Sequence, residues 1–232
     1  MLLAVILPKL LLVEKKDCGS YRTMLIFSNI GFMGIPLLAA TVGGEAVLYT
    51  ALFQFVFNIL IYTYGITAMR GKKEGKEGEN TGFKWKSLLN VGVISCVTAL
   101  VLYFSQVDLP DFVDTVLKNL ANLTAPLSML VIGQSFTEFK IRELFTDVRL
   151  LLFAAIKLLL LPVAGLSMLK LFIADPVILQ VCLVMLATPV ASMTAMLAQQ
   201  YDGNYELASR GVALTTILSV GTIPLVSVIV GL

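Results

Sequence analysis

The sequence predicts an all-α membrane protein built as a bundle of transmembrane helices, and composition and run length carry this prediction. Of the 232 residues, 58% are apolar and 14% are charged, and the mean hydropathy is +0.90. Soluble domains average roughly 45–50% apolar and about 25% charged residues. The apolar runs are continuous, whereas a membrane β-barrel needs polar and apolar residues in alternation along each strand. An ordinary soluble domain, a disordered chain, collagen and a coiled coil are therefore excluded.

Seven windows are long enough to cross a membrane, since a spanning helix needs about 20 predominantly apolar residues. They are 23–42, 46–69, 87–106, 115–136, 149–172, 177–200 and 211–232. Residues 1–13 form a shorter apolar stretch, without the preceding positive charge and the following small-residue cleavage site of a signal peptide. We interpret this stretch as the end of a helix whose beginning is missing.

The distribution of Lys and Arg predicts how the spans are oriented. Segment 70–86 is rich in Gly and charge, and if it is cytoplasmic, 14 of the 17 basic residues fall on its side of the membrane. The positive-inside rule then holds throughout. We expect 70–86 to be a basic linker on the cytoplasmic side of the cell membrane, with the C-terminus on the opposite side. A lipid-binding role for its Lys residues is the alternative to a plain topology signal.

Few chemical groups are available inside the spans. None of the seven windows contains Asp or Glu, which are the usual proton relays and cation sites of membrane proteins. Lys157 is the most deeply placed charge, and two interpretations remain open: a functional group, or a side chain that snorkels to the interface. The chain has no His and its three Cys lie far apart, so we expect no metal, no cofactor and no His-dependent catalysis. Nothing in the sequence indicates a nucleic-acid partner.

Two proline-containing segments in the spans predict broken helices. Five prolines lie within the windows, namely Pro36, Pro126, Pro162, Pro189 and Pro224. Segments 29–36 and 187–194 combine a proline with Gly, Ser, Thr or Asn at the middle of a span. This pattern is typical of the discontinuous helices that form binding sites in secondary transporters. The free N–H groups at the start of each half-helix favour an anion.

The two segments occupy similar positions along the chain. Each is followed by a polar Gly-containing turn and another long span, although the turn comes eight residues after Pro36 and fourteen after Pro189. We expect two halves of opposite orientation. Residues 1–69 form the remainder of the first repeat, with a partial helix and two spans; 70–86 form the linker; and 87–232 form a second repeat of five helices.

At these segments the chain resembles the auxin efflux carrier family, which includes plant auxin carriers and bacterial malate/malonate-type permeases. The resemblance covers nearly the whole chain in family order, and it is carried by residues 28–37, 125–133, 157–162, 187–189, 201–204 and 208–209. Each motif is short and apolar, so their joint order is the specific part of the signal.

This resemblance implies an architecture similar to that of the bile-acid/sodium symporters, with ten helices, two inverted repeats and crossed broken helices. It also implies a substrate site at the crossing, lined by Asn29, Gly34 and Pro36 from one half and by Thr188, Pro189 and Ser192 from the other. Two departures are visible. The ten-helix pattern requires about two and a half more helices before residue 1, and window 177–200 lacks the glutamate with which the bile-acid relatives bind sodium.

The sequence therefore predicts a secondary transporter that moves a small organic anion, dicarboxylate or auxin-like, across the membrane by alternating access. Its expected partners are this anion, the lipid bilayer and a second copy in a homodimer. Lys157 is a candidate counter-charge, and Gln134 either faces the cavity or makes an interhelical hydrogen bond. Gln54 and Asn58 share a helix face and are interpreted as contacts between helices. The alternative function is a non-transporting truncated paralogue or fragment of such a carrier. An enzyme is the least supported class, since no span offers a nucleophile with a base.

Overall fold

The computed structural model describes residues 2–69, 91–137, 141–201 and 203–232, so the predicted linker 70–86 lies outside the described residues. Within those ranges the regular secondary structure is helical, with an isolated antiparallel bridge between Ser28 and Val190. The predicted all-α fold is confirmed.

The first part of the chain contains a short helix, a broken helix and a long helix. In order, the elements are α1 (Leu2–Leu10), α2 (Cys18–Ile26), the π-helical turn η1 (Ile30–Gly34), α3 (Ile35–Thr41), α4 (Gly44–Leu60), the π-helical turn η2 (Ile61–Gly65) and α5 (Ile66–Met69). Because η1 runs directly into α3, and α4 runs through η2 into α5, two continuous helices result, Ile30–Thr41 and Gly44–Met69.

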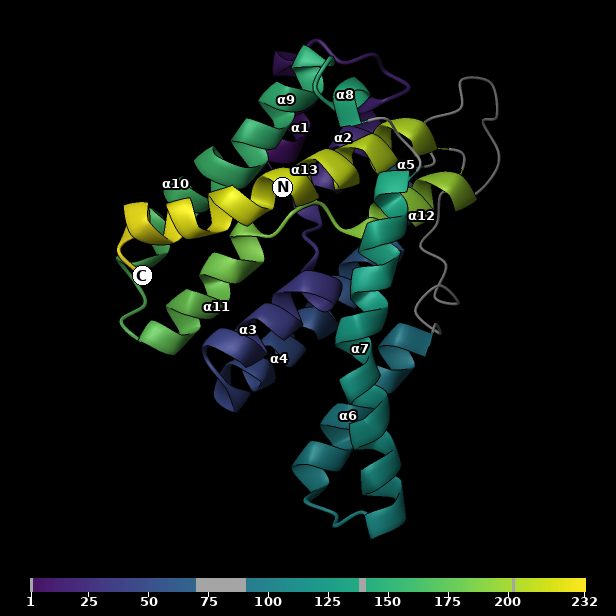
Figure 1. The fold of residues 1–232 in the computed structure, drawn as a ribbon, viewed down its shortest axis with the longest axis vertical. Helices are drawn as coiled ribbons and strands as arrows, with labels where there is room; N and C mark the ends of the chain where they lie inside the picture. The colour runs from purple at the N-terminus through teal and green to yellow at the C-terminus, as the bar shows by residue number, and fades with distance from the viewer. Residues whose placement is uncertain (1, 70–90, 138–140, 202) are drawn as a thin grey trace.

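The second part repeats the use of long and broken helices. It contains α6 (Val91–Ser105), α7 (Asp111–Thr137), α8 (Ile141–Leu144), α9 (Val148–Ala155), the π-helical turn η4 (Ile156–Leu160), α10 (Leu161–Leu169), α11 (Pro176–Ala187), α12 (Ser192–Gln200) and α13 (Tyr205–Val230). Figure 1 shows the lower parts of α6 and α7 extending away from the other helices, while α6 also packs against α4, and α7 against η1 and α13. Helix α13 packs against α2, α9, α11 and α12 as well.

Three helices of the described part are long and apolar enough to cross a membrane: Gly44–Met69, Val148–Leu169 and Tyr205–Val230. They fall in three of the seven predicted windows. Windows 23–42 and 177–200 are divided into half-helices instead, as the proline-containing segments predicted. The chain is thus an all-α membrane protein with both continuous and broken apolar helices.

Two of the π-helical turns have a common cause. Turn η1 ends two residues before Pro36, and turn η4 ends two residues before Pro162. A proline has no N–H to donate to the carbonyl four residues earlier, and a local π-helical turn accommodates this loss without ending the helix. Pro36 therefore widens its helix and does not break it, and the first break lies earlier in the chain than the sequence predicted.

Polar residues begin several helices of the second part. Asp175 starts α11 by accepting hydrogen bonds from the backbone N–H groups of Val177 and Ile178, at 2.8 and 3.1 Å. Asn204 starts α13 by accepting from Leu207 N at 3.0 Å, and its Nδ2 donates to Asp17 Oδ1 at 2.8 Å. A side-chain acceptor at this position satisfies a backbone donor that has no partner inside the helix. Asn204 also joins the start of α13 to the start of α2.

Candidate binding site at the crossing of two broken helices

The first break consists of Phe27, Ser28 and Asn29, between α2 and η1. The next helix starts at Asn29, whose carbonyl accepts from the backbone N–H groups of Met33 and Gly34 at 3.2 and 3.1 Å. Phe27 fixes the break against α4, because its ring packs edge-on against the ring of Phe57, with the centroids 5.4 Å apart. The Asn29 carbonyl therefore starts the helix, and the Asn29 side chain is left for other contacts.

The second break consists of residues 188–191, between α11 and α12. Thr188 is extended, with φ −64° and ψ 149°, which is the conformation that a following proline imposes. Pro189 has no N–H, so it enters the break as a hydrogen-bond acceptor only. The proline that the sequence singled out here does end a helix, in contrast to Pro36.

The two breaks cross and satisfy each other's backbone. Asn29 N donates to the carbonyl of Pro189 at 2.8 Å, and Ala191 N donates to the carbonyl of Phe27 at 3.0 Å. Unpaired backbone groups cost several kcal/mol in an apolar membrane interior, so a broken helix there needs such partners. The crossing of broken helices that the family resemblance implied is thus present.

Thr215 of α13 anchors the crossing from a third side. Its Oγ1 accepts a hydrogen bond from Val190 N at 3.1 Å and donates to the carbonyl of Gly211 at 2.7 Å. Thr215 could not be predicted as a site residue from the sequence, because a Thr in a membrane helix commonly bonds its own helix only.

The two breaks also correct the comparison between the halves. Counted from the ends of the breaks, Gly44 follows Asn29 by fifteen residues, and Gly203 follows Ala191 by twelve. Counted from Pro36 and Pro189 the intervals are eight and fourteen. The two intervals to the following turn are more alike when they are counted from the breaks, because Pro36 lies inside the helix that follows the first break.

Lys157 lies beside the first break, with its amine turned inwards. Its side chain is 2% exposed, and its Nζ donates to the carbonyl of Leu25 at 3.1 Å and to Ser28 Oγ at 2.6 Å. Leu25 is in the last turn of α2, where carbonyls lack helical partners and a basic group is favoured by the helix dipole. Lys157 therefore contacts the end of a half-helix and one residue of the break.

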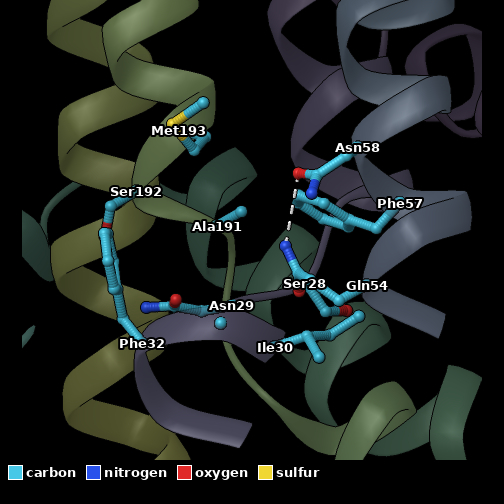
Figure 2. Close-up of a pocket in the computed structure, with 11 residues that line it drawn as sticks. Ser28, Asn29, Ile30, Phe32, Gln54, Phe57, Asn58, Ala191, Ser192 and Met193 are labelled. Atoms are coloured by element: carbon cyan, nitrogen blue, oxygen red, sulfur yellow. Dashed lines mark hydrogen bonds between the residues drawn. The ribbon is translucent and has the colours of Figure 1, made fainter. Parts of the chain in front are cut away.

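A pocket of about 160 Å³ opens at the crossing. It is smaller than the roughly 300–1,000 Å³ of pockets for drug-sized ligands, so its size suits a small molecule. Its lining comes from the first break and η1, from α4 and from the start of α12: Ser28, Asn29, Ile30, Gly31, Phe32, Gln54, Phe57, Asn58, Ala191, Ser192 and Met193. Figure 2 shows Asn29, Phe32 and Ser192 on one side of the close-up and Gln54, Phe57 and Asn58 on the other.

Three polar atoms of this lining are buried and lack a hydrogen-bond partner: Asn29 Nδ2, Ser192 Oγ and Gln54 Oε1. The Asn29 and Ser192 side chains are only 3% and 6% exposed. Leaving such a group unpaired costs about 1–3 kcal/mol, and a native structure rarely keeps several of them together without a use. Three unpaired groups around one cavity indicate a site for a polar ligand.

Two helix starts meet at this pocket. The helix Ile30–Thr41 begins at its floor, and α12 begins with Ser192 and Met193 in its wall. Neither Asn29 nor Ala191 caps its helix with a side-chain hydrogen bond. The first N–H groups of a helix and its positive dipole end favour negative charge. Among the described residues that line the pocket, no side chain is charged.

The predicted site residues fall into four groups. Asn29 and Ser192 line the pocket, whereas Thr188 and Pro189 are buried in the second break and are not part of the described lining. Gly34 and Pro36 lie in the helix after the first break, where Gly34 faces Val184 of α11. The fourth group is Lys157, which contacts Ser28 of the lining, and Gln134, which is exposed on α7 and is not part of the described lining.

Helix α4 contributes two polar residues to the pocket. The sequence predicts Gln54 and Asn58 as contacts between helices, yet both line the pocket, and Gln54 Nε2 donates to Asn58 Oδ1 at 3.4 Å. Their spacing by four residues already placed them on one face, but only the fold shows that this face meets Gly31. No group of three or more His, Cys, Asp or Glu that could hold a metal ion occurs among the residues described.

Crossed, broken apolar helices around a small pocket that holds a few polar groups are the arrangement of membrane transport proteins. Residues 1–227 match the model of the family described as "Membrane transport protein", and the chain belongs to this family. The family is auxin efflux carrier-like, so the resemblance found in the sequence is confirmed.

One relative is a protein of Rhizobium meliloti (strain 1021) described as "Putative malonate transporter". It is 25% identical over 201 residues, which cover 85% of this chain and 62% of the relative. The chain thus aligns with somewhat less than two thirds of the length of this relative.

Proposed function

We propose that this protein is a secondary transporter of a small organic anion, and that the anion binds in the pocket at the crossing of the two breaks. The observation that carries the proposal is the pairing of unsatisfied buried donors, Asn29 Nδ2 and Ser192 Oγ, with two helix starts at one cavity. A carboxylate supplies the acceptors that both donors lack, and it is attracted by both helix dipoles.

Malonate is the first substrate to test, because the relative from Rhizobium meliloti is named for it. Its three-carbon skeleton also suits a pocket of about 160 Å³. Phe32 and Phe57 in the lining offer apolar contact to the carbon skeleton of an organic anion. An auxin-like aromatic anion is the second candidate, which the same two rings favour.

We propose alternating access because the same arrangement of a break, a turn and a long helix occurs twice in the chain. Each break lies between half-helices and is followed by a turn and a continuous helix of 26 residues, Gly44–Met69 or Tyr205–Val230. We propose that 1–69 and 87–232 belong to two inverted repeats, and that one part of the molecule rocks against another around the crossing. The homodimer remains a prediction from the sequence.

The test is equilibrium binding of radiolabelled malonate to the purified chain in detergent, followed by flux into proteoliposomes. We expect saturable binding that falls at least tenfold in Asn29→Ala and in Ser192→Ala, since each loses a donor to an anion. Thr194→Ala is the matched control, because Thr194 Oγ1 is buried in the same helix but donates to its own chain, at Ala191 O.

Each outcome has a distinct meaning. Binding that is equal in Asn29→Ala, Ser192→Ala and the control would place the ligand elsewhere and overturn the site. Binding without flux would favour the alternative in which the chain is a non-transporting member of the family. Flux that is lost in the Asn29 variant supports the transporter.

A further inference from the structure

The pocket does not present hydrogen-bond donors alone. The Gln54 amide lies against Gly31 and donates through Nε2 to Asn58 Oδ1, and this leaves Gln54 Oε1 buried without a donor. A buried amide oxygen needs an O–H or N–H group, as much as the amide nitrogen of Asn29 needs an acceptor. A ligand that satisfies the pocket therefore carries an acceptor for Asn29 and Ser192 and a donor for Gln54.

A fully ionised dicarboxylate fails this requirement. Both of its carboxylates are acceptors only, so one of them would face the lone pairs of Gln54 Oε1, which is buried. Repulsion between two acceptors and the loss of hydration would then oppose binding. A singly ionised dicarboxylic acid has one carboxylate and one O–H donor, and it can satisfy all three atoms.

The charges around the pocket lead to the same ligand. The lining has no basic side chain among the described residues, and the nearby amine of Lys157 is bonded to Leu25 O and Ser28 Oγ. The positive charge at the pocket therefore comes from the two helix starts, each equivalent to roughly half a positive charge. Together they balance about one negative charge, not two.

We propose that the pocket selects the singly ionised form of a small dicarboxylic acid, with its carboxylate on Asn29 and Ser192 and its carboxyl O–H on Gln54. This inference rests on the proposed function. The dianion takes up one proton from water before it binds, so the proton enters the site on the ligand. A site of this kind needs no carboxylate of the protein to carry that proton, in agreement with the absence of Asp and Glu from all seven windows.

Charged groups occur on several of the surrounding elements. Lys157 contacts Ser28 from η4, Arg22 is partly buried on α2, and Glu45 is exposed at the start of α4. On α7, Asp111 is exposed and Lys118 pairs with Asp114 at 2.6 Å, and on α13, Arg210 pairs with Glu206 at 2.6 Å. A ligand that does not titrate is therefore needed to separate a change in the protein from a change in the ligand.

The test compares three probes of nearly equal size. The affinity of the purified full chain for each probe is measured while the pH is raised through the second pKa of malonic acid. Malonate changes from monoanion to dianion. Malonamate keeps one carboxylate and an N–H donor at every pH, and monomethyl malonate keeps one carboxylate but has no donor at its other end.

We expect the affinity for malonate to fall about tenfold per pH unit above that pKa, as the monoanion becomes scarce. Malonamate should keep its affinity over the same range and bind at least tenfold more tightly than monomethyl malonate. The inference is overturned if malonate binding is constant or rises with pH, or if the ester binds as well as the amide.

Gln54→Met tests the assigned contact, since Met keeps the length of the side chain and removes its oxygen. The preference for malonamate over the ester should disappear in Gln54→Met and persist in Gln200→Met, a change at an exposed residue outside the described lining. If none of the probes binds at any pH, or if binding is unchanged in Asn29→Ala and Ser192→Ala, the proposed function itself fails. Binding that needs Asn29 but ignores the donor refutes this inference alone.

Discussion

Single polar side chains stabilise the breaks between half-helices inside an apolar environment. Thr215 and Lys157 lie on different helices, yet each supplies a hydrogen bond to one of the two breaks. Thr215 accepts from Val190 of the second break, whereas Lys157 donates to Ser28 of the first and to the last turn of α2. Since unpaired backbone is costly away from water, the breaks depend on these side chains as well as on each other.

Replacement of Lys157 by Met should destabilise the protein. The variant leaves Leu25 O and Ser28 Oγ without their donor, and we expect a loss of roughly 1.5–3 kcal/mol, as for hydrogen bonds that involve a charged group. The measurement is the midpoint of thermal unfolding in detergent, together with malonate affinity. Lys118→Met is the control, because Lys118 is exposed and paired with Asp114 on its own helix, and we expect little change there.

Two results would contradict the role given to Lys157. An unchanged midpoint with complete loss of malonate binding would identify it as a counter-charge that contacts the ligand. A raised midpoint would mean that burying the amine costs more than its two hydrogen bonds contribute.

At the scale of the helices, close approach between α2 and α5 holds the first half-helix in place. α2 has only nine residues, too few to be a stable helix alone, so its position depends on packing. Gly19 faces the backbone of α5, and an added methyl group would overlap the carbonyl oxygen of Ala68. A backbone atom cannot turn away as a flexible side chain does, so α2 requires Gly at this position.

Gly19→Ala should therefore move or loosen α2 and the break that follows it. We expect a loss of about 1–3 kcal/mol, the usual cost of overpacking, and a weaker malonate affinity because Asn29 follows α2 directly. Gly221→Ala is the matched control within a helix, since a methyl group there meets nothing within 4 Å. Its higher helix propensity should leave stability equal or slightly raised. An unchanged unfolding midpoint in Gly19→Ala would show that α2 can shift freely.

At the scale of the whole molecule, the basic residues predict an orientation in the membrane. The three long apolar helices and the family place the chain in a membrane, and the positive-inside rule predicts which face is cytoplasmic. The predicted cytoplasmic linker 70–86 carries six Lys and Arg, while the connection between α6 and α7 carries Asp108, and Asp111 and Asp114 follow in the first turn of α7.

Cysteine labelling tests this orientation. In a background without Cys18, Cys96 and Cys182, a cysteine at Gly78 should react with a membrane-impermeant maleimide in inverted vesicles and not in intact cells. A cysteine at Asp108 should show the reverse pattern. The same pattern at both positions, or the opposite pattern, would refute the predicted topology.

Much of the fold could be predicted because its causes are local. The composition required membrane helices, and the residues around Thr188 and Pro189 required a break, since a proline ends hydrogen bonding wherever it falls. The position of the first break was less certain. Pro36 dominated the pattern, but a π-helical turn absorbed it, and the break formed at Phe27–Asn29, where Pro189, Ala191 and Lys157 provide partners.

The sequence by itself determined that the chain is helical, lies in a membrane, avoids carboxylates in its spans and uses broken helices. These properties depend on residue type and on neighbours within a few positions. Only the tertiary structure decided that Gln54 faces the pocket, that Thr215 and Lys157 hold the two breaks, and that Gly34 packs against α11. Each of these depends on which helix faces lie together, and that is set by the packing of residues 23 to 150 positions apart, which no local pattern contains.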